Sequence, residues 1–172
     1  MSRLAVAGVA LAWVLAAGCG APPAQRTNGK MYKMGERVQV GPLIYTVLDT
    51  EWLDSLGGGQ ELRMPRHRFL AVRVSVTNSG IATSGIPPMT LTGAGGNSYS
   101  ELTDARGLSD WLGYLRTVRA AETVYGRALF DVPADSYRLN LTDDAEPDKM
   151  KVATVDLPLQ VNTTLPVNEV PK

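Results

Sequence analysis

The chain has 172 residues, and its 17 basic and 17 acidic side chains give a formal net charge of zero. Proteins bind the phosphates of nucleic acids with an excess of positive charge, so nucleic acid is not an expected partner. With a single histidine and a single cysteine, the sequence also lacks the ligands of a zinc cluster and the cysteine pairs of a disulfide framework. It predicts no metal and no cofactor.

The first residues have the pattern of an export signal. Arg3 is followed by an uncharged stretch from residue 4 to 17 (LAVAGVALAWVLAA) and then by Gly18 and Cys19. As a helix this stretch would span only ~21 Å, against a hydrocarbon core of ~30 Å. A positive residue, a short apolar stretch and small residues before a cleavage point predict a signal peptide over residues 1–18. A plain secretory signal and a buried apolar helix are the alternatives.

The same segment resembles the signal of bacterial lipoproteins, in which small residues precede an invariant cysteine. That family prefers leucine three places before the cysteine, where this chain has Ala16. The resemblance implies cleavage before Cys19, lipidation of its thiol, and anchoring in a bacterial lipid bilayer on the periplasmic side or at the cell surface. Residues 19–33 are then expected to form a lipidated tether, because they are polar and contain Pro22 and Pro23.

Residues 34–161 are predicted to form one domain built of short strands. Two β-rich stretches, 36–40 and 43–53, are separated by a Gly-Pro pair. Between residues 68 and 77 (RFLAVRVSVT) apolar and polar side chains alternate, which places Val74 toward the core and Arg73 on the opposite face. Further strands are predicted near 89–92, 97–100, 122–132, 137–142 and 149–161. Residues 162–172 are expected to be a flexible tail.

Seven or eight short strands separated by turns favour an all-β fold, an immunoglobulin-like antiparallel β-sandwich, with at most one short helix. That helix is predicted within residues 105–115, where four apolar residues recur at spacings of three and four. On such a helix Tyr114 and Arg116 would point outward beside Arg119. Aromatic and arginine side chains are common in binding hot spots, so these three residues are candidates for a partner surface. A plain lid over one end of the sandwich is the alternative.

Three motifs in this region resemble a known family. They are residues 67–80 (HRFLAVRVSVTNSG), 91–99 (LTGAGGNSY) and 123–133 (TVYGRALFDVP). In this order they are similar to the long strand, the hairpin and the closing strand of the telokin-like, immunoglobulin-fold domain of exported bacterial proteins, such as the immunoprotective extracellular protein of mycobacteria. Where that family usually has Pro-Gly before the closing strand, this chain has Ala120 and Ala121. The resemblance implies an immunoglobulin-like sandwich with no established activity.

The sequence contains few residues that could form a catalytic site. Any Ser-His-Asp arrangement must use His67, which stands between Arg66 and Arg68 at a strand end, where an exposed residue is expected rather than a general base. The three glycines at 57–59 lack the Gly-Lys-Ser/Thr that completes a phosphate-binding loop, and predict a flexible loop. The acidic residues at 143–148 offer oxygen ligands for calcium, but without the spacing of the known calcium loop, so a solvated turn is favoured.

The sequence therefore predicts a membrane-anchored extracytoplasmic lipoprotein that is not an enzyme. It is expected to act as a non-catalytic binding or protein-interaction module whose partner is a protein or a small ligand. A structural accessory subunit of an envelope assembly is the alternative, and a small hydrolase that uses His67 comes third.

Overall fold

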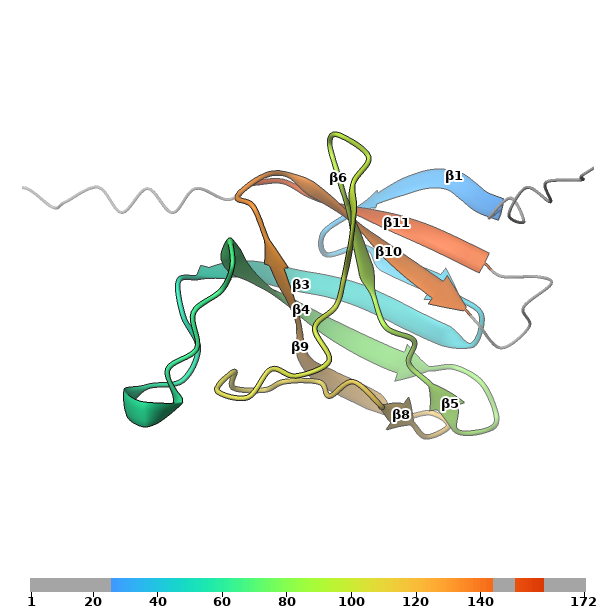
Figure 1. Cartoon of the computed structure of the whole chain (residues 1–172). Helices are drawn as coiled ribbons and strands as arrows, with labels where there is room; N and C mark the ends of the chain where they lie inside the picture. The colour runs from blue at the N-terminus through green and yellow to red at the C-terminus, as the bar shows by residue number, and fades with distance from the viewer. Residues whose placement is uncertain (1–25, 144–150, 160–172) are drawn as a thin grey trace, which may run out of the picture.

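The computed structural model describes residues 26–143 and 151–159, which form two packed β-sheets and a small third sheet (Figure 1). The five-stranded sheet has the order β1 (Arg26–Lys33), β11 (Lys151–Leu157), β10 (Tyr137–Asp143), β6 (Thr90–Gly93), β7 (Ser98–Ser100). The four-stranded sheet has the order β2 (Arg37–Val40), β3 (Leu43–Leu53), β4 (Arg68–Asn78), β9 (Thr123–Val132). The third sheet pairs β5 (Ser84–Gly85) with β8 (Thr117–Val118). The predicted all-β sandwich is confirmed.

The strand count and one pairing differ from the prediction. The described residues hold eleven strands rather than seven or eight, and three of them (β5, β7 and β8) have only two or three residues. Residues 26–33, predicted to be part of the tether, form β1, which pairs in parallel with β11. Tyr32 lies opposite Val155 and packs against the core. Partial burial of this aromatic side chain favours pairing of the otherwise polar segment with β11.

The main core lies between the two sheets. Strand β4 supplies its centre, because Val72, Val74 and Val76 are completely buried. Opposite them, β10 and β11 contribute Leu139 and Val155, which are also completely buried. The alternation predicted for β4 is thus confirmed on this face.

The other face of β4 is only partly open to solvent. Phe69 and Ala71 on that face are buried, together with Leu56, Ala105 and Leu129, in a second apolar cluster. Residues 101–116, which connect β7 to β8, form part of this cover. The first half of β4 is therefore buried on both faces.

The helix predicted within residues 105–115 is wrong. These residues form turns, and their backbone has positive φ at Gly107 (87°), Asp110 (56°) and Gly113 (83°), which a right-handed helix does not allow. The apolar spacing has another origin: Leu108 and Trp111 pack on the second cluster, while Leu112 packs on the main core. The described residues include no helix long and apolar enough to cross a membrane.

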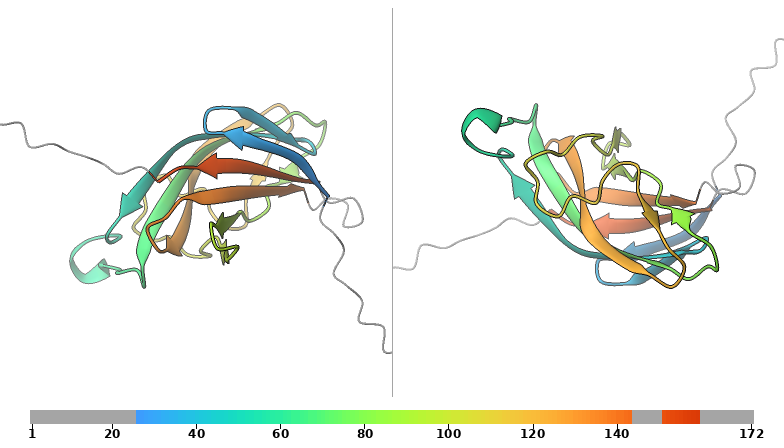
Figure 2. Two further views of the ribbon diagram at one scale, coloured as in Figure 1. Left: turned by 90° about the horizontal axis from the view of Figure 1, so that it is seen from above. Right: turned by 90° about the horizontal axis from the view of Figure 1, so that it is seen from below.

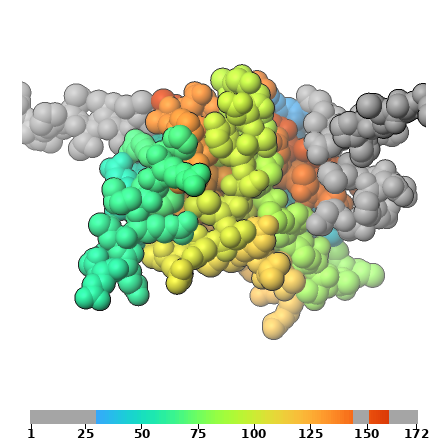
Figure 3. Space-filling view, in the orientation of Figure 1, coloured from blue at the N-terminus to red at the C-terminus, as the bar shows by residue number. Residues whose placement is uncertain are grey.

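The long β3–β4 connection, residues 54–67, projects from one end of the sandwich (Figure 1). It contains a single 3-10 turn, η1 (Gly59–Glu61). Figure 2 shows that β1, with which the described chain begins, starts at the opposite end. In the space-filling view the teal 54–67 loop lies beside the yellow 101–116 loop (Figure 3). The two loops thus share the end of the molecule that is distant from Arg26.

Candidate functional site

Arg116, predicted to point outward, lies inside the protein with its side chain only 4% exposed. Its guanidinium forms a two-pronged ion pair with the buried carboxylate of Glu101, with 2.8 Å between Nη2 and Oε2. The same guanidinium donates to the carbonyl oxygens of Gly113 (2.6 Å) and Pro87 (3.3 Å). Glu101 also accepts a hydrogen bond from the backbone N–H of Met89 (2.9 Å). Paired in this way the charge can be buried. The prediction that Arg116 points outward is therefore wrong.

The two other predicted surface residues flank Arg116 in the chain. Tyr114 is half-buried, and Arg119 is exposed. The backbone N–H of Arg119 donates to the Glu122 carboxylate (3.1 Å). In the described part of the chain, no hydrogen bond joins the side chains of Tyr114 and Arg119. The structure thus keeps them accessible without assembling them into one site, and their role at a surface stays a prediction.

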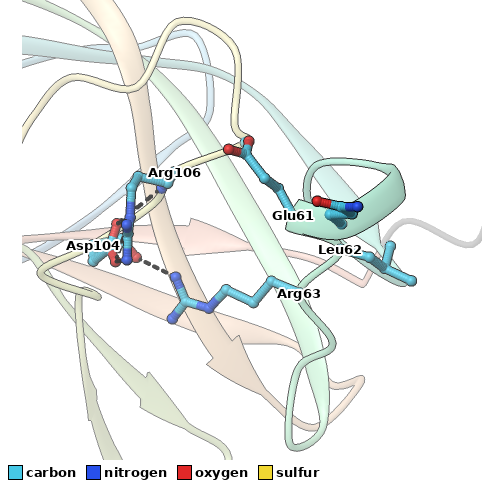
Figure 4. A pocket seen from close by; sticks show the side chains of 7 residues that line it. Glu61, Leu62, Arg63, Asp104 and Arg106 are labelled. Carbon is cyan, nitrogen blue, oxygen red and sulfur yellow. Dashed lines mark hydrogen bonds and ion pairs between the residues drawn. The ribbon is translucent and has the colours of Figure 1, made fainter.

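A groove that the sequence did not reveal lies between the two long loops. Its cavity volume is about 290 Å³. The 54–67 loop contributes one wall and the 101–116 loop the other (Figure 4). The lining residues are Gln60, Glu61, Leu62, Arg63, Asp104, Arg106 and Gly107. We call it the loop groove.

Hydrogen bonds and close packing hold the two loops in place. Leu56 and Arg63 exchange both of their backbone hydrogen bonds at 2.9 Å, which closes the glycine-rich turn between them. Arg63 Nη1 donates to the carbonyl oxygen of Asp104 (2.7 Å) and so connects one loop to the other. A Cβ atom at Gly107 would lie 2.6 Å from the backbone nitrogen of Gly57, so this close approach requires glycine. The walls of the groove are therefore tied to each other.

The charges of the loop groove are arranged around Asp104. Its carboxylate accepts hydrogen bonds from Arg106, with 2.9 Å between Nη2 and Oδ2 (Figure 4). These hydrogen bonds lower the pKa of Asp104 and raise the pKa of Arg106, so both groups are ionised at neutral pH. Arg63, whose guanidinium lies over the Phe69 ring at 5.6 Å from its centroid, adds a second cation. The groove thus offers two guanidinium groups, the paired carboxylate of Asp104 and the carboxylate of Glu61.

Two large apolar side chains project from the same loop. Leu62 is 54% exposed and Met64 is 66% exposed, and Arg63 stands between them. Sequence reasoning missed this combination because the segment has no hydrophobic period. The available signal was the interleaving of apolar and arginine residues at positions 62–66 (LRMPR).

His67 lies at the end of the same loop, and its backbone N–H donates to Asp131 Oδ1 (2.9 Å). Arg66 N–H donates to the other oxygen of that carboxylate (2.7 Å), so Asp131 fixes the entry into β4. The His67 side chain is exposed, and among the described residues no hydroxyl forms a hydrogen bond with its imidazole. The described ranges also contain no group of three His, Cys, Asp or Glu side chains that could hold a metal ion. Of the acidic stretch 143–148, only Asp143 lies within them, while Cys19 lies outside.

Several solved bacterial structures have a similar fold. The yjhA protein from Bacillus subtilis is 16% identical, with a TM-score of 0.56 over 73% of this chain and 100% of that chain. The secreted protein MPT63 from Mycobacterium tuberculosis is 17% identical, with a TM-score of 0.55 over 74% of this chain and 96% of that one. The ycdA protein, a candidate lipoprotein of Bacillus subtilis, is 21% identical, with a TM-score of 0.53 over 70% of this chain and 38% of that one. At these identities the likeness shows the fold alone.

The search among curated proteins found no match. One family matches residues 32–151, a range that runs from β1 to the first residue of β11 and contains the loop groove. Because this match covers more than half of the sequence, the chain belongs to the family described as "Domain of unknown function (DUF4352)".

Proposed function

We propose that this protein is a lipid-anchored, extracytoplasmic binding module that acts without catalysis and binds a protein partner at the loop groove. The anchor is supported by the uncharged stretch that ends at Gly18 and Cys19. An extracytoplasmic location is supported by the similar folds of the secreted Mycobacterium tuberculosis protein and of the Bacillus subtilis candidate lipoprotein.

The position of the loop groove suits this role. Cys19 precedes Arg26 by only a few residues, so a lipid attached to Cys19 would hold the domain from the end of the sandwich where β1 begins. The 54–67 loop, which forms one wall of the loop groove, projects from the other end (Figure 2). A domain held in this way presents the groove away from the bilayer, where a partner can reach it.

The observation that carries the proposal is the exposure of two large apolar side chains next to Arg63: Leu62, which lines the groove, and Met64, which follows Arg63 in the same loop. Protein interfaces are enriched in methionine and arginine, and a few apolar anchors surrounded by polar residues supply most of their binding energy. Methionine adapts its flexible side chain to different partner surfaces. The loop groove offers this composition on a fixed backbone.

Photo-crosslinking in living cells tests the proposal. A photoreactive amino acid placed at Met64 is expected to give a discrete crosslinked product in the membrane fraction. The control position is Ile81, which is fully exposed (101%) in the turn after β4, at the opposite end of the sandwich. The absence of a product from Met64, or the same products from Met64 and Ile81, would overturn the proposal.

A further inference from the structure

The outer face of the four-stranded sheet carries a second hollow, with a cavity volume of about 400 Å³. Cavities of this size are typical of small-molecule sites. Its lining residues are Leu48, Arg73, Asp110, Trp111, Tyr125 and Gly126. None of them lines the loop groove. We call it the sheet hollow.

Two exposed apolar groups form part of its lining. The register between β3 and β4 shifts between Val47 and Asp49, so Leu48 is the extra residue of a bulge, and it is 42% exposed. On β9, Tyr125 is 69% exposed and lies opposite Ser75 of β4. A large aromatic residue with this exposure on an ordered strand presents its apolar surface to solvent.

Another part of the lining is fixed by the edge of β9. Arg127 N–H donates to the Asp110 carbonyl oxygen (2.8 Å), and Leu112 N–H donates to the Arg127 carbonyl oxygen (3.0 Å). Residues 110–112 therefore run beside the strand. A Cβ atom at Gly126 would lie 2.8 Å from Leu112 Cδ1 and 3.0 Å from the Asp110 carbonyl oxygen, so the close approach depends on glycine. Asp110 and Trp111 are thus held in place before any ligand arrives.

Two of the residues that line the sheet hollow have side-chain nitrogens without a hydrogen bond. Trp111 Nε1 and Arg73 Nε are buried nitrogens without a hydrogen bond in the described structure. Arg73 Nε lies 3.4 Å from Asp49 Oδ2, an ion-pair distance without hydrogen-bond geometry. The Asp110 carboxylate has neither a hydrogen bond nor an ion pair within the described residues. A buried donor without an acceptor is unfavourable, so a ligand that accepts these hydrogen bonds is favoured.

The charges select the class of ligand. A carboxylate ligand that reached Arg73 would be repelled by Asp110 and Asp49, and an ammonium ligand would be repelled by Arg73. A neutral hydroxylated ligand avoids both problems, because hydroxyl groups accept hydrogen bonds from Trp111 and Arg73 and donate one to Asp110. The C–H face of a sugar ring suits Tyr125 and Leu48.

An extended peptide is also neutral and amphipathic, but it usually binds by adding a strand to a sheet edge. At Arg127 both backbone groups of the β9 edge are already bonded to residues 110 and 112. We therefore propose that the sheet hollow binds a neutral saccharide, with Tyr125 as the stacking platform and with Arg73, Asp110 and Trp111 as hydrogen-bonding groups.

The experiment follows the indole N–H signal of Trp111 by nitrogen-15 NMR in the purified full-length protein. The signal is assigned by its loss in Trp111→Phe. Maltotriose, cellotriose and chitotriose are the probes, and at least one is expected to shift the signal saturably. Tyr125→Ala should weaken binding about tenfold, whereas Tyr125→Phe keeps the ring and should retain most of the affinity. Ile81→Ala, on a distant turn, should leave it unchanged.

Two results would overturn this inference: no shift with any of the three saccharides, or a saturable shift with a tripeptide or with hexanoate but with no saccharide. Because the sheet hollow and the loop groove share no residue, either result leaves crosslinking from Met64 unaffected. Failure of the saccharide site is thus distinguishable from failure of the proposed function.

Discussion

Tyr137, at the start of β10, shows how a single polar atom is accommodated in the core. The side chain is 3% exposed, and its hydroxyl donates to the carbonyl oxygen of Pro133, four residues earlier, at 2.6 Å. The ring packs edge-on against Tyr99, with 5.7 Å between centroids. This hydrogen bond fixes the β9–β10 corner, in the manner of the tyrosine corners of β-sandwiches.

Replacing Tyr137 by phenylalanine should lower the free energy of unfolding by about 1 kcal/mol, because the Pro133 carbonyl oxygen loses its donor. The matched control is Tyr99→Phe, since the Tyr99 hydroxyl makes no hydrogen bond to other described residues. Urea denaturation of both variants measures the difference. Equal losses would mean that the Pro133 contact contributes nothing specific.

The same phenol predicts a pH dependence. Burial, with smaller contributions from Tyr99 and Asp135, raises the pKa of Tyr137 to about 12, against about 10 in an unfolded chain. Above pH ~10 the unfolded state releases this proton while the folded state keeps it. The stabilisation is therefore complete below pH ~10 and decreases as the pH rises toward ~12. The unfolding free energy of the wild type should fall more steeply in this range than that of Tyr137→Phe.

Arg116 was predicted to point outward but is buried, so its replacement is expected to destabilise the fold. Arg116→Ala leaves the Glu101 carboxylate buried without its partner, which should cost about 3–5 kcal/mol. Arg119 is exposed, and Arg119→Ala should change stability by less than ~0.5 kcal/mol. Thermal denaturation of the two variants measures these losses of stability. A loss for Arg116→Ala as small as that for Arg119→Ala would show that the buried ion pair is absent in solution.

Among the elements, β4 shows how far alternation can be predicted. The face that carries Val72 and Val74 was predicted correctly, because a period of two depends on the strand alone. Burial of Phe69 and Ala71 on the other face was not predictable, since it depends on contacts with Leu56 and Ala105 from loops distant in sequence. A strand's own alternation can thus be predicted from the sequence. The burial of its outer face under a long loop cannot.

Two substitutions on the outer face of β4 test this cover. Ala71→Asp places an unpaired charge beneath the 101–116 loop and should cost several kcal/mol. Ser75→Asp, on the same face but only half-buried, should cost less than ~1 kcal/mol. Chemical denaturation provides both values. Similar losses of stability at the two positions would contradict the conclusion that the outer face of β4 is covered at Ala71 and partly open at Ser75.

The 101–116 loop explains why the site prediction was incomplete. Its apolar spacing indicated a helix, but Gly107, Asp110 and Gly113 have positive φ, and the chain turns at each of them. The loop groove and the sheet hollow both depend on where these turns place the loop against 54–67 and against β9. The walls of each site are far apart in the sequence. A search for local motifs therefore finds neither site.

For the whole molecule, turn-separated short strands sufficed to predict the sandwich, because this pattern recurs along most of the described chain. Strand β1 was not predicted, because its sequence, RTNGKMYK, is mostly polar and its pairing with β11 joins residues more than a hundred positions apart. We propose that this domain is held at a membrane through Cys19, with the loop groove directed away from the membrane.

The most direct test of that claim is mass spectrometry of the N-terminal peptide from the membrane fraction of cells that express the protein. We predict a peptide that begins at Cys19 and carries the mass of an attached diacylglycerol, and its loss from the membrane fraction in Cys19→Ser. A peptide that retains residues 1–18, or wild-type protein in the soluble fraction with a free Cys19 thiol, would contradict the account.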